Sequence, residues 1–185
     1  MLRSLRLPLL SLLLLTGLGA VSSPAAAARP LTLGFFDGFS PGGEAGAVRL
    51  GEAQALGSGV ARVLVFWSQV APPVQATGFR ATDPGAPQYN WTATDAAVRD
   101  AEARGLRVIL SITSAPRWAE GPRRPPGAAA GTWRPSAEAL GDFATAAARR
   151  YSGRYPDPGR AGATLPSVRY WQVWNEPNLS DHLSP

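Results

Sequence analysis

The sequence predicts an α/β fold with parallel strands. Four segments of strand length, 31–36, 60–67, 106–112 and 170–174, alternate with three segments of helical character. The second segment is apolar almost throughout, as is typical of strands that helices bury on both faces. Strands that alternate with helices form parallel sheets with right-handed crossovers, so the expected order is βα, βα, βα, β.

The first two units have helices of different strength. Val48 and Leu56 indicate a helix after the first strand, although Gly51 weakens the pattern. After the second strand comes a loop rich in Pro, Gly and Ala, and a helix starts near Thr92. Thr92 and Asp95 have the spacing of a capping box, in which the two side chains would satisfy the first free N–H groups of the helix.

The third unit has the clearest helical pattern. Ser136 is placed to cap a helix that follows the long loop 117–134. Apolar residues then recur at the spacing of one helix face, so we expect this face to pack on the sheet. These residues are Leu140, Phe143, Ala144, Ala147 and Tyr151.

Length alone does not distinguish an open sheet from a barrel, but two observations favour a (β/α)8 TIM-type barrel reduced to its first four strands. The long loops follow the carboxyl ends of strands, where barrels build their active sites. The first strand is not followed by the Gly-x-Gly-x-x-Gly pattern of dinucleotide-binding open sheets. We therefore expect no nucleotide cofactor.

Composition excludes several classes of function. The 185 residues are 45% hydrophobic and 17% charged, which fits one globular domain. There is no cysteine and one histidine, His182, which excludes thiolate and multi-imidazole metal sites, so no metal is expected. The net charge of +5 comes from scattered arginines and not from a basic patch interleaved with aromatic residues, so we expect no nucleic-acid partner.

Residues 1–28 have the features of a secretory signal peptide. Arg3 and Arg6 precede the apolar segment 7–18, and 25–27 (Ala-Ala-Ala) offers a cleavage site. The apolar segment is shorter than the roughly 20 residues that span a bilayer. An uncleaved membrane anchor is the alternative. Both readings place the remainder, 29–185, outside the cytoplasm, and we expect a secreted protein without membrane contact after cleavage.

The chemistry is concentrated in the last strand and the segment after it. Segment 170–174 is aromatic and β-branched, and Pro177 ends the strand because it cannot donate to the ladder. This places the carboxylate of Glu176 at the carboxyl end of an apolar strand. Burying a charge is costly, so we expect the aromatic neighbours to exclude water from Glu176 and keep it protonated, as a general acid requires.

Residues 174–178 (Trp-Asn-Glu-Pro-Asn) resemble the acid/base motif of retaining β-glycoside hydrolases with a (β/α)8 barrel, the cellulase and xylosidase clan. The alternative is a chance match in a strand-to-loop turn. The resemblance implies that Glu176 follows the fourth strand and protonates the glycosidic oxygen, and that Asn175 binds the 2-hydroxyl of the sugar. It covers 29–185, which corresponds to the N-terminal half of the domain in that clan.

Further substrate contacts are expected at neighbouring strands. The resemblance implies that Arg62 supports the nucleophile, while pairing with a carboxylate such as Asp37 is the alternative. Trp67, Trp118 and Trp174 lie at or just past strand ends, where aromatic rings can stack on pyranose faces; core packing is the alternative for each of them.

Two departures from the clan limit the prediction. Thr113 and Ser114 occupy the place where many members have a histidine. The nucleophile of the clan is a Glu after the seventh strand, and a full barrel takes about 250 residues. The carboxylates nearest the expected mouth do not lie at that position. These are Asp37, Glu120 and Asp181.

We therefore expect an incomplete hydrolase domain for O-glycosyl bonds, inactive alone, with a carbohydrate substrate. Its first and fourth strands would have unpaired edges. A secreted, non-catalytic carbohydrate-binding or interaction module is the alternative. An extracellular barrel with a different activity is a weaker one, because a fold does not fix a function.

Overall fold

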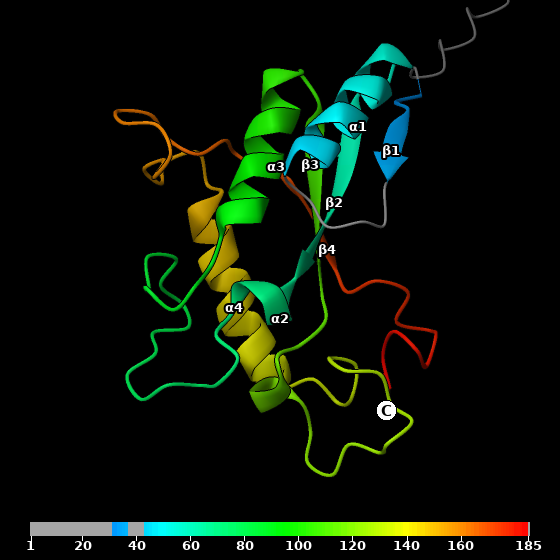
Figure 1. Cartoon of the computed structure of the whole chain (residues 1–185), viewed down its shortest axis with the longest axis vertical. Coiled ribbons are helices and arrows are strands. Elements are labelled where there is room, and N and C mark those ends of the chain that lie inside the picture. The colour runs from blue at the N-terminus through cyan, green and yellow to red at the C-terminus, as the bar shows by residue number, and fades with distance from the viewer. Residues whose placement is uncertain (1–30, 37–42, 185) are drawn as a thin grey trace, which may run out of the picture. The chain divides into compact units, whose positions relative to one another are not determined.

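The computed structural model describes residues 31–36 and 43–184. Four parallel strands form one sheet in the order β1-β2-β3-β4, which confirms the predicted α/β class and strand order (Figure 1). The strands are β1 (Gly34–Phe36), β2 (Val60–Phe66), β3 (Arg107–Thr113) and β4 (Tyr170–Val173). β1 and β4 are the edge strands of this sheet.

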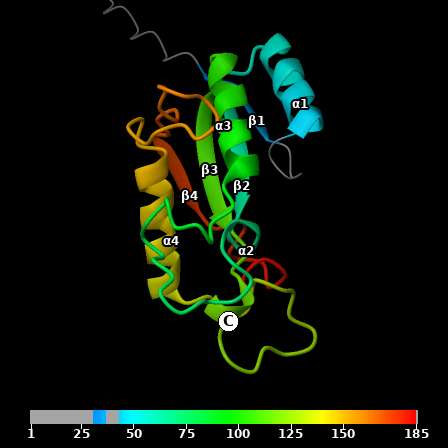
Figure 2. The same ribbon diagram turned by 60° about the vertical axis from the view of Figure 1, so that its left-hand side comes forward.

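Three long helices alternate with the strands: α1 (Gly43–Ala55), α3 (Thr92–Ala103) and α4 (Ala137–Arg150). They cover one face of the sheet (Figure 2). The core lies between this face and the helices. Alternate residues of β2 and β3 belong to it, together with the apolar faces of α3 and α4. The strand residues are Ala61, Val63, Val65, Val108, Leu110 and Ile112.

The remaining side chains of each strand lie on the opposite face of the sheet, because successive side chains of a strand point to opposite faces. Arg62, Leu64 and Phe66 of β2 lie on it, next to Ser111 of β3 and Gln172 of β4. In the part of the chain that the structure describes, no helix packs on this face.

The start of α4 is as predicted, and the start of α3 is not. Ser136 Oγ accepts a hydrogen bond from the N–H of Ala139 at 3.2 Å. For α3 the predicted capping box is wrong, because Trp91 occupies the N-cap and the side chain of Asn90 accepts the N–H of Thr92. The side chain of Asp95 instead points into the protein, where its carboxylate forms an ion pair with Arg150, 55 residues away in the sequence.

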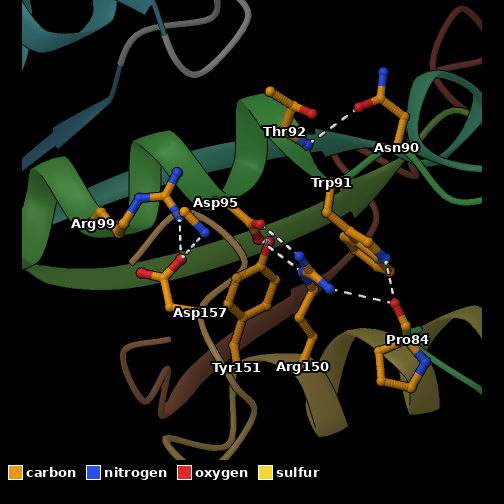
Figure 3. Close-up of polar contacts among 10 residues, drawn as sticks. Pro84, Asn90, Trp91, Thr92, Asp95, Arg99, Arg150, Tyr151 and Asp157 are labelled. Atoms are coloured by element: carbon orange, nitrogen blue, oxygen red, sulfur yellow. Dashed lines mark hydrogen bonds and ion pairs between the residues drawn. The ribbon is translucent and has the colours of Figure 1, made fainter. Parts of the chain in front are cut away.

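That ion pair joins α3 to the end of α4 (Figure 3). Asp95 accepts hydrogen bonds from Nε and one terminal nitrogen of Arg150, at 2.8 and 2.5 Å, and from the hydroxyl of Tyr151 at 2.9 Å. Arg150 also donates to the carbonyl of Pro84, which accepts the indole N–H of Trp91 as well. The network therefore fixes the long loop after β2 to both helices. Burial and the carboxylate of Asp95 raise the pKa of Tyr151 well above its usual range.

The predicted secretion signal, residues 1–28, lies outside the described residues, as does Asp37. None of the helices in 31–36 and 43–184 combines the length and the hydropathy needed to cross a bilayer.

Candidate functional site

A hollow of about 440 Å³ lies at the carboxyl end of the sheet. All four strands or the segments that follow them contribute to its lining. Phe36 ends β1, Phe66 ends β2, Ser114 follows β3, and Asn175 and Glu176 follow β4. Leu64, Thr113, Ala129, Ala130, Thr132, Asp181 and His182 complete the lining. Parallel strands bring their carboxyl ends to one edge, and this is where α/β folds commonly bind ligands.

The backbone is irregular at this edge. Ser114, Trp174 and Glu176 have left-handed φ values of 58°, 67° and 45°, which are uncommon for residues other than glycine. Two of them flank Asn175, while the N–H of Trp174 still bonds the carbonyl of Ile112 at 2.7 Å. Unfavourable φ values in non-glycine residues cluster at functional sites, so this edge is a candidate on backbone geometry alone.

A row of polar side chains crosses the face of the sheet over which no helix of the described residues lies. Arg62 donates from Nε to Ser111 Oγ at 2.9 Å and from a terminal nitrogen to Asn175 Oδ1 at 2.6 Å. Ser111 in turn donates to Gln172 Oε1 at 2.9 Å. Arg62 also lies 4.3 Å from the centre of the Phe36 ring. The structure thus brings together Arg62 and Asn175, which the sequence places 113 residues apart.

His182 connects Asn175 to Glu176. Its Nδ1 lies 3.1 Å from Asn175 Nδ2, and its Nε2 lies 3.2 Å from Glu176 Oε2. The loop after β4 folds back to place the ring there, because the indole of Trp174 donates to the carbonyl of His182 at 2.7 Å. From the sequence we inferred of His182 only that a single histidine cannot form a metal site built on several imidazoles. No local pattern marks it as a neighbour of Glu176.

Glu176 lies after the fourth strand, where the sequence predicts it, but it is not shielded by aromatic rings. Its side chain is 57% exposed, and its Oε2 contacts Nε2 of His182 at 3.2 Å. The expected exclusion of water is therefore wrong for these residues. The left-handed backbone at Trp174 turns the indole into the protein, where it is buried. The side chain of Glu176, two residues further on, faces solvent.

The predicted tryptophan contacts are not at the hollow. Trp67 is fully buried and stacks on Phe143 at 5.6 Å between ring centres, with Trp118 edge-on at 5.8 Å. Trp118 is partly buried and donates to the carbonyl of Pro72. Trp174 is buried beneath the loop. The structure therefore places Trp67 and Trp174 in the core, the alternative that their sequence positions left open.

Two phenylalanines provide apolar surface at the hollow instead. Phe36 is 46% exposed and Phe66 is partly buried, and both line it. Phe66 lies on the same face as Arg62 and Leu64 by the period of the strand. The alternation of β2 is therefore the sequence signal that favours Phe66 over Trp67 as the aromatic residue at the hollow.

Glu120 holds one wall of the hollow. Its carboxylate is 1% exposed and accepts the N–H groups of Gly131 and Trp133, at 2.8 and 3.3 Å, with two arginines nearby. Gly131 in turn approaches Ser114 so closely that a Cβ there would lie 2.5 Å from Ser114 Oγ. Glu120 is thus occupied by the loop itself, while Asp181 lines the hollow.

Across residues 31–36 and 43–184, no three His, Cys, Asp or Glu side chains come together in a group that could hold a metal ion. Compared with known proteins, the sequence matches no family model and no curated protein. The site's geometry therefore carries the functional argument.

Proposed function

We propose that this chain supplies the acid/base half of a secreted retaining glycoside hydrolase. The observation that carries the proposal is the pair Asn175 and Glu176 at the end of the fourth parallel strand, with Asn175 bound to Arg62 on β2. Both residues line a hollow with apolar and polar walls, as sugar-binding sites require.

We further propose that the sheet is half of a (β/α)8 barrel. Parallel sheets are normally covered on both faces, yet the face with Arg62 and Ser111 has no helix over it in the described residues. Four further strands that pair with β1 and β4 would cover this face by closing on it. The nucleophile would come from that second half, about 5–5.5 Å from Glu176.

The proposed reaction assigns each polar group a task. Glu176 protonates the glycosidic oxygen, and its carboxylate then removes a proton from the incoming water. The oxygen of Asn175 is occupied by Arg62 and one of its N–H bonds faces His182, so the second N–H remains for a sugar hydroxyl. Substrate and the second half would provide the exclusion of water that these residues lack.

The second candidate function is a non-catalytic carbohydrate-binding module. Among the described residues, the carboxylates that line the hollow are Glu176 and Asp181, and both lie on the loop after β4. Retaining cleavage needs two carboxyl groups on either side of the scissile bond. The arrangement therefore favours binding without cleavage by this chain alone.

The test compares the full gene product with its Glu176→Gln variant on aryl β-glycosides. We expect a loss of about 10²–10⁴-fold in kcat, the usual contribution of a general acid. Glu138→Gln, an exposed carboxylate at the start of α4, is the matched control and keeps the full rate. Equal rates for wild type and Glu176→Gln would refute the acid role. Binding of β-glycosides without hydrolysis by the full gene product would favour the module.

A further inference from the structure

His182 is the residue in the described part of the chain that contacts both Asn175 and Glu176. We propose that it is a positioning residue: its Nε2–H tautomer holds Oε2 of Glu176 and leaves Oε1 to exchange the proton with the sugar. The inference rests on the proposed function for its catalytic consequence, but the tautomer follows from the contacts alone.

The tautomer of His182 is determined by Arg62, which acts through Asn175. The guanidinium group only donates, so the atom of Asn175 that faces it at 2.6 Å is the oxygen. The amide nitrogen therefore faces His182 Nδ1 at 3.1 Å, and it too only donates. Nδ1 must accept this bond, which requires an unprotonated Nδ1 and places the proton on Nε2.

The proton on Nε2 points to Glu176. Nε2 lies 3.2 Å from Oε2, so the neutral imidazole donates a hydrogen bond to this oxygen. Arg62, Asn175, His182 and Glu176 thus form a chain in which each contact joins a donor to an acceptor. Asp181, the other carboxylate at the hollow, lies next to His182 in the sequence.

An exposed glutamate needs such a contact to have a defined position. Glu176 is more than half exposed, and a free side chain of this kind loses considerable rotamer entropy when it is fixed. The backbone of His182 is itself anchored, because its carbonyl accepts the indole N–H of Trp174 and its backbone N–H donates to the carbonyl of Leu179. The histidine can therefore transmit the rigidity of the loop to the carboxyl group.

Nitrogen NMR of the chain tests the tautomer without any enzyme assay. The protein has one histidine, so its ring nitrogens give one set of signals. We expect Nδ1 in the unprotonated range and Nε2 in the protonated range at neutral pH. In Asn175→Asp a carboxylate that only accepts faces Nδ1, so we expect a proton on Nδ1 there. A proton on Nδ1 in the wild type would overturn the proposal, as would an unprotonated Nδ1 in Asn175→Asp.

Two amide variants separate the two contacts of the ring. The amide nitrogen of His182→Gln can take the place of Nε2 and donate to Glu176, while the amide oxygen of His182→Asn can only take the place of Nδ1 and accept from Asn175. In the full gene product, we expect His182→Asn to lower kcat on phenyl β-glycosides by about 10²-fold, with little change in KM. His182→Gln should recover most of this loss.

The leaving group distinguishes positioning from a structural role. Dinitrophenyl glycosides leave without protonation, so the first chemical step should hardly change in His182→Asn for these substrates. An equal loss with both leaving groups, or equal effects of His182→Asn and His182→Gln, would overturn the positioning role. If Glu176→Gln proves fully active, the proposed function fails while the NMR result stands or falls independently.

Discussion

Replacing Asp95 by Asn should destabilise the fold severely without changing its shape. The carboxylate accepts three hydrogen bonds, two from Arg150 and one from Tyr151. Asp95 and Arg150 are only 4% and 6% exposed. An Asn of the same size keeps one acceptor oxygen and turns an amide nitrogen towards the guanidinium group, so a donor faces a donor.

The magnitude follows from what remains buried. Arg150 keeps its charge, its carbonyl partner at Pro84 and its place over the Trp91 ring, but loses its counter-charge. Breaking a buried ion pair from one side costs about 3–5 kcal/mol, because the remaining charge is desolvated without compensation. The free energy of unfolding of a typical domain is about 5–15 kcal/mol, so the variant should lose a large part of its stability.

Equilibrium unfolding in urea, followed by tryptophan fluorescence, measures this loss. Asp83→Asn is the matched control, because Asp83 pairs with Arg80 at 2.7 Å at the surface, where such pairs contribute about 0–1 kcal/mol. The double variant Asp95→Leu with Arg150→Met should be less destabilised than Asp95→Asn. A loss below about 1 kcal/mol in Asp95→Asn would show that water reaches the pair and would refute the reasoning.

Four further predictions concern the same fold. Because burial raises the pKa of Tyr151, the folded state keeps the phenol proton above pH 10 while the unfolded chain releases it. The contribution of Tyr151 to stability is complete below pH 10 and falls above it by about 1.4 kcal/mol per pH unit. Burial raises the pKa of Tyr89 as well, so Tyr151→Phe should reduce the alkaline slope by this one contribution in urea titrations at several pH values. Ser136→Ala removes the cap of α4 and should cost about 1 kcal/mol; an unchanged Tm would show that the cap is unimportant. Phe143→Ala opens a cavity between two indole rings and should cost about 3–5 kcal/mol in the same unfolding assay, unless the rings collapse onto each other. Gly131→Ala should lower Tm, because φ there is +83° and the new Cβ would meet Ser114; a Tm equal to that of wild type would mean that the loop shifts without cost.

The sequence predicted the strands and the strong helix well because their signals are local. An apolar run identifies β2 and β3 whatever lies beyond them, and the spacing from Leu140 to Tyr151 fixes the face of α4. The capping role of Asp95 failed for the opposite reason. Its partner Arg150 is 55 residues away, and a buried ion pair outweighs a cap at the helix surface.

The site was predictable in its position and not in its contacts. Pro177 cannot continue a strand and so places Glu176 after one, although β4 already ends at Val173, before the left-handed backbone of Trp174. The exposure of Glu176 depends on left-handed backbone at residues that are not glycine, for which the sequence has no signal. The tryptophans were selected as strand-end aromatics, but the period of β2 places Trp67 on the helix side with Val65.

The polar row on the open face is unusual for a parallel sheet and ties the site to the fold. Ser111 is fully buried although none of the helices in the described residues covers it, and its hydroxyl both accepts from Arg62 and donates to Gln172. Groups that satisfy one another in this way can be desolvated at little cost, whereas unpaired ones cannot. A face built like this is prepared to be covered, and Asn175 sits where the row reaches the carboxyl edge. Arg62 belongs to the row and also binds Asn175. In the proposed barrel, covering the row would therefore also fix the amide that we propose to bind the sugar.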